Sequence, residues 1–318
     1  GRYAMDPVQA ITSIRKFVSA DISDGILKPE QAKQFYVQVF EQLEFSKLHR
    51  KIHRTAKSGE IDKLGIGQRL LRAKTEGPAS DDGYRVAPTS GRVQYTCARL
   101  KLPWEISEDA IHDNIEGEAL ETKWMGMLTT QLGIDLEDLH WNSDTAAGAG
   151  PDQAFLILND GWLKQLSAGA HVVDASIGFA DAKIGKDKFF AAVQALPSKY
   201  LGNPRLSWMM NKVTEYAWIE YVSSRATGAG DLALLGSAAQ TPLGYPIVKV
   251  PSFADGQVVF SDPKNFISVN TWDVRIRKTS EGKEAVMNDM RYGSIFLDDD
   301  PIIEEPDAAV IIKNMTIV

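Results

Sequence analysis

The sequence predicts an α+β fold in which one apolar core carries long appendages. Of the 318 residues, 44% are hydrophobic, which is enough for the core of one large domain or two medium ones. Segments with the apolar spacing of a helix are mixed with segments that alternate at the period of a β-strand. Several of the helical segments have too little apolar surface to fold alone, so they are expected to dock on something else.

Composition and charge exclude several classes of protein. The apolar content excludes a disordered chain, and the single cysteine, Cys97, excludes a disulfide scaffold. A formal net charge of −7 argues against a protein that coats nucleic acid by charge alone. No apolar run approaches the roughly twenty residues of a membrane span, and no secretory leader is apparent, so we expect no membrane contact.

The net charge of the whole chain conceals two segments of opposite charge. Residues 1–76 contain 14 Lys and Arg against 9 Asp and Glu, whereas residues 101–140 contain 2 against 10. Such an asymmetry predicts contact between unlike surfaces.

The N-terminal part is predicted to form an arm of narrow amphipathic helices. Residues 6–19 place apolar side chains on one helical face, and a second helix is expected to begin near Pro29. A basic cluster is expected on the same helical run, facing an acidic partner: Lys47, Arg50, Lys51, Arg54 and Lys57.

The next segment is predicted to be an extended hairpin over residues 58–102. Glycines interrupt any helix in residues 58–72, and residues 73–91 are too polar and too rich in turn residues to pack. Residues 92–102 alternate as a returning strand. The expected tip contains Pro78, Asp81, Asp82 and Gly83.

The longest helix is predicted over residues 107–132. Ser107 is the expected N-cap, acidic residues follow it at the positive end of the helix dipole, and Gly133 is expected to stop the helix. Residues 142–151 form a joint of small residues. The tryptophans that flank this helix either anchor a neighbouring subunit or pack in the core. The candidate contact residues here are Trp104, Glu108, Glu116, Glu121 and Trp124.

The remainder is predicted to mix short helices and strands. We expect a buried strand over 154–158, helices from 161 and over 189–196, an apolar helix over 208–223, and a turn into a strand over 243–248. Residues 266–278 alternate as a strand, followed by a turn at 280–283 and a partner strand to 291. The last strands are expected at 294–297 and 309–312.

No motif supports a catalytic, cofactor or metal site. His49 and His53 have the spacing of zinc-binding histidines on a helix, but the flanking Arg and Lys would repel a cation. The glycine pairs at 65–67 and 228–230 lack the rest of a phosphate-binding motif, and a hinge or turn is the simpler interpretation. The acidic run 298–300, with the glutamates at 304–305, lacks the spacing of a calcium loop and suggests a solvated turn. No histidine has a recognisable nucleophile for a catalytic triad.

The order of these segments resembles the tailed-bacteriophage major capsid protein family, which has the Hong Kong 97-type fold. The most specific match is residues 234–248, Leu-Leu-Gly-Ser-Ala-Ala-Gln-Thr-Pro-Leu-Gly-Tyr-Pro-Ile-Val. The run Arg291-Tyr292-Gly293 before the last strands is similar to the closing strands of that family. Residues 25–31 and 60–67 are similar to capsid N-terminal arms.

This resemblance implies a division of the chain into the parts of a capsid subunit. Residues 1–57 would be the N-terminal arm, 58–104 the E-loop region, and 105–151 the spine helix of the P-domain. Residues 152–261 would be the A-domain, and 262–318 the P-domain strands with a closing A-domain strand.

The resemblance also implies a function. The chain would be a structural protein and not an enzyme. It would form pentamers and hexamers of an icosahedral shell around double-stranded DNA, bound without sequence specificity. Expected partners are further copies, portal and decoration proteins, and either a separate scaffolding protein or a scaffolding segment already cleaved from the chain. The location would be the virion, after assembly in the bacterial cytoplasm. The alternatives are an encapsulin-type nanocompartment, an enzyme with a hinge site near 228–230, and a decoration or portal-associated protein.

Overall fold

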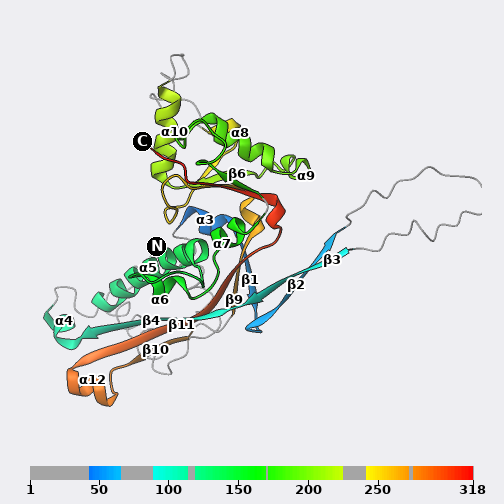
Figure 1. Cartoon of the computed structure of the whole chain (residues 1–318). Coiled ribbons are helices and arrows are strands. Elements are labelled where there is room, and N and C mark those ends of the chain that lie inside the picture. The colour runs from blue at the N-terminus through cyan, green and yellow to red at the C-terminus, as the bar shows by residue number, and fades with distance from the viewer. Residues whose placement is uncertain are drawn as a thin grey trace, which may run out of the picture.

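The computed structural model describes residues 43–65, 89–113, 119–169, 171–224, 241–271 and 275–317. Within these ranges the chain forms a compact upper module, a long sheet below it, and a two-stranded ribbon that projects to one side (Figure 1). The α+β class predicted from the sequence is confirmed.

The long sheet is organised by one strand, β11 (Met290–Ile303). Its first part pairs antiparallel with β4 (Ala98–Ser107) on one side and with β10 (Arg275–Thr279) on the other. Its last part pairs with β9 (Phe266–Thr271), and β1 (Arg50–Arg54) lies parallel to β9.

One face of this sheet is covered by the longest helix, α5 (Ala119–Asn142). Leu132 and Leu136 of the helix pack on Ile276, Ile295 and Leu297 of the sheet. Burial alternates along β11, as expected for a strand with one face under a helix and the other open.

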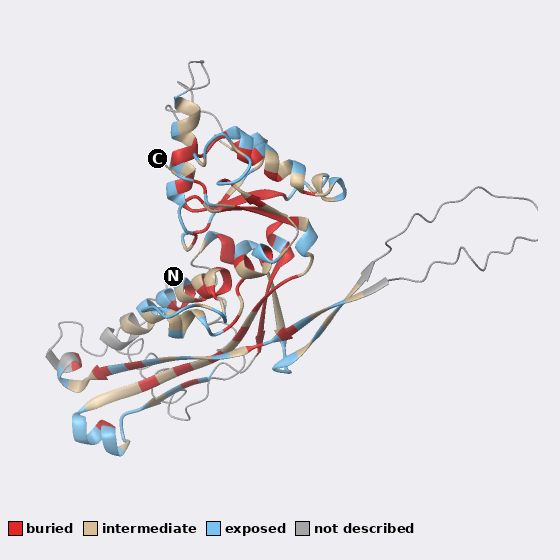
Figure 2. Cartoon of the chain, in the orientation of Figure 1, coloured by how far each residue is buried: buried red, intermediate tan, exposed pale blue. Residues whose placement is uncertain are grey.

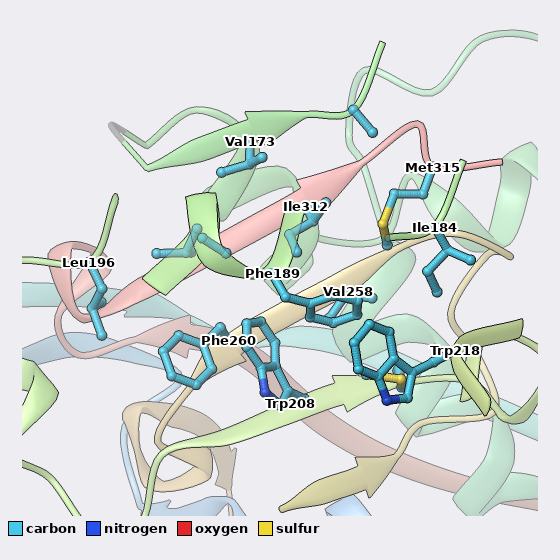
Figure 3. Close-up of a cluster of buried hydrophobic side chains, with 14 of the residues drawn as sticks. Val173, Ile184, Phe189, Leu196, Trp208, Trp218, Val258, Phe260, Ile312 and Met315 are labelled. Carbon is cyan, nitrogen blue, oxygen red and sulfur yellow. The ribbon is translucent and has the colours of Figure 1, made fainter. Parts of the chain in front are cut away.

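The upper module is built on a second five-stranded sheet in the order β5-β12-β8-β6-β7. On one face α8 (Lys186–Ala195) and α10 (Lys212–Ser223) enclose a core that includes Phe189, Trp208 and Trp218 (Figure 3). The strands are β5 (Val172–Asp174), β6 (Ser207–Met210), β7 (Ile247–Lys249), β8 (Val258–Ser261) and β12 (Ala309–Lys313).

Alternate residues of these strands point to a second core on the opposite face. Met209, Val259 and Ile311 pack there against α7 (Trp162–Ser167) and α3 (Glu44–Leu48). This second core joins the upper module to the long sheet, so buried residues run continuously from one to the other (Figure 2). The remaining short elements are α4 (Glu108–Asp113), α6 (Gln153–Leu156), α9 (Ser198–Leu201), α12 (Lys283–Asn288), η2 (Pro242–Gly244), η3 (Pro263–Asn265) and η4 (Pro306–Ala308).

The predicted hairpin is confirmed at its base up to residue 96, whereas residues 98–102 of the predicted returning strand belong to β4 and pair with β11. Strand β2 (Ser58–Gly65) pairs antiparallel with β3 (Thr89–Thr96), and the predicted tip lies outside the described residues. The predicted helix near 161, the helix over 189–196 and the last strand are also confirmed, by α7, α8 and β12.

Five local predictions of secondary structure are wrong. The basic segment is not one helix: α3 ends at Leu48 and β1 follows, because β1 gains a parallel partner in β9. The long helix continues through Gly133 to Asn142, because packing on the sheet outweighs the roughly 1 kcal/mol that glycine costs a helix. Residues 153–156 form α6 and residues 283–288 form α12, although strands were predicted at both places.

The fifth wrong prediction concerns residues 208–223. Residues 207–210 are the fully buried strand β6, and the helix starts only after Asn211. The side chain of Asn211 caps α10 by accepting a hydrogen bond from the backbone N–H of Thr214 at 2.8 Å. In the part of the chain that the structure describes, no helix combines the length and the apolar character needed to cross a bilayer.

Candidate functional site

The acidic run of β11 lies at the point where the ribbon, the long helix and strand β9 meet. Asp299 is completely buried. Its Oδ1 accepts a hydrogen bond from Asn270 Nδ2 of β9 at 2.6 Å, and its Oδ2 contacts His140 Nε2 of α5. The expectation of a solvated turn at 298–300 is therefore wrong, because neighbours distant in the sequence surround this part of β11.

The carboxylates on either side of Asp299 bind other elements. Asp300 Oδ2 accepts the backbone N–H of Thr96, at the end of β3, at 2.8 Å. Asp298 Oδ2 accepts a hydrogen bond from the Oγ1 hydroxyl of Thr271, at the end of β9, at 3.3 Å. Three successive residues thus connect β11 to the ribbon, to α5 and to β9. We call Asp298, Asp299 and Asp300 the acidic junction.

A second polar layer connects α3 to the same helix and sheet. His49 Nε2 lies 3.0 Å from Ser268 Oγ of β9, and Ser46 Oγ donates to Glu137 Oε2 of α5 at 3.5 Å. Burial lowers the pKa of His49 well below its ordinary value, and the nearby His140 lowers it further. Burial raises the pKa of Glu137 to about 7.

Aromatic rings hold this layer in place. The ring of Phe45 in α3 lies 4.8 Å from Trp141 and 5.6 Å from Trp162, and the two tryptophans are 4.8 Å apart. A side chain at position 161 would meet the backbone oxygen of Trp141 at 2.7 Å, so only glycine fits there. The end of the arm is therefore fastened to the C-terminal end of α5.

The base of the ribbon has its own anchors. Tyr95 and Cys97 are buried against Ile267, Val269 and Ile302 of the long sheet. Lys63 of β2 donates to the backbone oxygen of Glu304 and lies 3.5 Å from a carboxylate oxygen of Glu305. Residues 58–63 and 91–94 of the ribbon are half-buried or exposed, so the ribbon projects from a fixed base (Figure 2).

The predicted basic cluster does not form one helical face. Lys47, Arg54 and Lys57 are exposed, and Lys51 is half-buried. Arg50 pairs with Glu304 of the same chain at 3.0 Å. Part of the basic charge predicted to face an acidic segment is therefore paired within the subunit. Its partners are Glu304 and Glu305, and not residues of the long helix.

The acidic and aromatic residues predicted to contact a neighbouring subunit differ in how much of each side chain is exposed in this structure. Trp104 is buried against Gly293, which leaves little of its ring for a neighbour, and Trp124 is half-buried beside it. Glu108 forms a two-point ion pair with Arg291, which lowers the pKa of Glu108. Glu116 and the side chain of Glu121 lie outside the described residues, as do Pro78, Asp81, Asp82 and Gly83 of the expected tip.

Sequence reasoning missed both the acidic junction and a set of exposed apolar side chains. Val286 and Met287 of α12 are 67% and 77% exposed at the far end of the long sheet (Figure 1). Met127 on the outer face of α5 is 63% exposed. The sequence predicted a strand through Val286 and Met287, from the turn at 280–283 to residue 291, and the structure places them in α12 instead.

The described residues contain no group of three or more His, Cys, Asp or Glu side chains placed to hold a metal ion. His49 and His53 do not share a helix, and His49 Nε2 lies within hydrogen-bond distance of Ser268 Oγ. The junction is therefore a joint between elements: paired polar groups inside an apolar surround fix the relative placement of the arm, ribbon, helix and sheet.

Comparison with solved structures identifies the fold. A chain of the satellite phage P4 procapsid, solved with the size determination (Sid) protein, superposes with a TM-score of 0.62 at 14% identity, covering 89% of this chain and 98% of that one. The capsid of a native GTA particle gives 0.59 at 16% identity, covering 86% and 90%. The chain has the Hong Kong 97-type capsid fold.

Other comparisons agree with this fold. Gordonia phage Cozz contains a chain with a TM-score of 0.57 at 14% identity, with 85% of each chain covered. In sequence, the chain is 28% identical over 304 residues to the prophage capsid protein YqbE of Bacillus subtilis (strain 168), covering 92% of this chain and 93% of YqbE. No family model matches the sequence. The resemblance inferred from the order of the segments is confirmed.

Proposed function

We propose that this chain is the major capsid protein of a tailed phage or prophage. It assembles into the pentamers and hexamers of an icosahedral shell around packaged double-stranded DNA, and it resides in the virion. The observation that carries this proposal is the coincidence of two independent likenesses over nearly the whole chain: the capsid fold and the sequence similarity to a prophage capsid protein. Its role is structural and requires no catalytic residue.

The parts of the fold support the domain division proposed from the sequence. In this proposal the ribbon β2–β3 is the projecting part of the E-loop region (58–104), α5 is the spine helix, and the upper module, completed by β12, is the A-domain (152–261). A two-stranded ribbon is at best marginally stable in water by itself. Its extension away from the core is therefore best explained by burial on a neighbouring copy.

The contact surfaces proposed for assembly combine charge and exposed apolar area. Lys47 of α3, Arg54 at the end of β1 and Lys57 just before β2 are exposed cations. Val286 and Met287 form an exposed apolar tip. Exposing apolar side chains to water does not stabilise a monomer, so a contact surface is the better explanation. All five side chains are exposed, so a neighbouring copy has access to them.

Further partners follow from the same role. A scaffolding protein would guide assembly, and portal and decoration proteins would complete the particle. With a net charge of −7, the chain is suited to enclose DNA without binding it tightly or by sequence.

The direct test is negative-stain electron microscopy of the purified full-length chain, with and without a co-expressed scaffolding protein. We expect closed shells or capsomers, and a monomer in both conditions would contradict the proposal. Shells of one small size filled with a single enzyme would instead indicate a nanocompartment.

Variants at the apolar tip sharpen this test. Replacing Val286 and Met287 together with aspartate should lower the yield of shells while leaving the circular dichroism of the subunit unchanged, because both side chains are exposed. A matched control replaces the exposed pair Glu281 and Glu284 with alanine. Equal shell yields for the two double variants would exclude this tip as a contact.

A further inference from the structure

The loop between α6 and α7 is tied at both of its ends to the end of α5. The backbone N–H of Asp144 donates to the oxygen of Leu156 at 2.8 Å, and the backbone N–H of Gly161 donates to the oxygen of Ser143 at 2.8 Å. Residues 156–161 therefore begin and end against two consecutive residues. Because successive Cα atoms are about 3.8 Å apart, every residue of this loop lies close to that tie.

The side chain of Asn159 is buried in this loop without a hydrogen bond. The two residues before it, Ile157 and Leu158, are 43% and 38% exposed, whereas Asn159 is 6% exposed. In the part of the chain that the structure describes, neither its Nδ2 nor its Oδ1 has a hydrogen-bond partner. Burying an amide without a partner is costly, and most buried polar atoms of native proteins have one.

A second buried polar group without a partner belongs to the residue at the tie. Ser143 is 1% exposed, and its Oγ has no hydrogen-bond partner among the described residues. Two more such atoms lie on neighbouring residues, Nε1 of Trp141 and Oγ of Ser252. Ser252 is next to the end of α5, since its backbone oxygen accepts a hydrogen bond from Asn142 Nδ2 at 2.7 Å. These atoms are thus gathered where α5 ends.

Charged side chains cover the solvent side of the same loop. Lys164 Nζ of α7 lies 2.6 Å from Asp144 Oδ1 and 2.7 Å from Asp160 Oδ1, and the three side chains are 32%, 40% and 45% exposed. Both carboxylates therefore have a cation, whereas the unpartnered atoms beneath them are neutral donors and acceptors. A ligand of these atoms must donate and accept hydrogen bonds without carrying a charge.

We propose that ordered water is bound inside the α6–α7 loop and bridges the Asn159 amide to the Ser143 hydroxyl. Internal water sites occur where a few buried polar groups lack other partners, and water is small enough to fit among them. The water accepts from Asn159 Nδ2 or donates to its Oδ1, and it forms a second hydrogen bond with Ser143 Oγ. It thereby fastens the loop before α7 to the end of the long helix. This inference uses contacts within one subunit, so it does not depend on the proposed capsid function.

The direct test is a crystal structure of the full-length native chain at a resolution that shows ordered water. We expect a density peak about 2.7–3.2 Å from Ser143 Oγ and from one amide atom of Asn159. The absence of a peak there, or an Asn159 amide bonded directly to a protein group, would overturn the proposal.

Urea unfolding of variants tests the bridge in solution. Asn159→Leu and Ser143→Ala each remove one partner of the water, so each should lower the unfolding midpoint. Together they should lower it by less than the sum of the two shifts, because both substitutions act on the same water. Additive shifts would overturn the bridge, and so would a midpoint raised by Asn159→Leu, which is the result expected if the amide were simply unpaired.

Ser261→Ala is the matched control. Ser261 is also a buried serine, but its hydroxyl donates directly to the backbone oxygen of Ala308 at 2.8 Å. Its shift should therefore add fully to that of Asn159→Leu.

Discussion

Replacing Asp299 with alanine should destabilise the subunit by about 4 kcal/mol. The side chain is 0% exposed and serves two partners, Asn270 Nδ2 at 2.6 Å and His140 Nε2. Without the carboxylate, each of these buried groups loses an acceptor that water cannot replace, at about 1–3 kcal/mol per group. For two groups the sum is about 2–6 kcal/mol, with about 4 kcal/mol in the middle of that range.

The assay is urea unfolding of the unassembled full-length subunit, followed by tryptophan fluorescence. The midpoint should fall with little change in slope, as expected when stability changes and the exposed surface does not. Asp299→Asn keeps an acceptor for Asn270 and a polar group facing His140, so it should cost less, about 1–2 kcal/mol.

Asp298→Ala is the matched control. Asp298 is half-buried and accepts one long hydrogen bond of 3.3 Å, so its loss should cost less than about 1 kcal/mol. If Asp299→Ala and Asp298→Ala shifted the midpoint equally, the buried contacts of Asp299 would not stabilise the junction, and the reasoning would be refuted.

Three further predictions concern α5 and the strand it covers. Gly293→Ala should cost about 1–3 kcal/mol in urea unfolding and change the near-ultraviolet circular dichroism, because the new Cβ would lie 2.2 Å from ring atoms of Trp104; an unchanged spectrum would contradict this contact. Gly126→Ala should stabilise the subunit by about 0.5–1 kcal/mol, since the glycine is in the interior of α5 with open space around it; a lower unfolding midpoint would be the opposite result. Glu137 has a pKa of about 7 in the folded chain, against an ordinary value of 4.5 for a glutamate, so the folded chain binds this proton more tightly than the unfolded chain does. The free energy of unfolding should therefore fall as pH rises from 4.5 to 7. Glu137→Gln should flatten that part of the profile, and a profile identical to that of the native chain would show that Glu137 is not the titrating group.

Local sequence patterns predicted the elements whose neighbours are close in the chain. The hairpin base β2–β3 was signalled by turn residues and by alternation in the returning strand, and α8 by its apolar spacing. Such elements depend on contacts within a few residues, which a single sequence displays.

Elements with distant partners were predicted poorly. The basic segment from 47 to 57 has the charge of a solvated helix, yet residues 50–54 form β1 because β9, more than two hundred residues later, offers a parallel edge. The apolar run at 208–210 fits a buried helix as well as a buried strand, and only its position between β7 and β8 makes it a strand.

The sequence by itself determined the fold class, the projecting hairpin, the opposed charges of the arm and the middle segment, and the resemblance to capsid proteins. These depend on composition and on the order of segments, which the chain carries locally. Only the tertiary structure decided that Asp298, Asp299 and Asp300 are a junction and not a solvated turn. The physical reason is that a carboxylate's environment is set by the groups that surround it, and those of Asp299 come from α5 and β9, elements that only folding brings to β11.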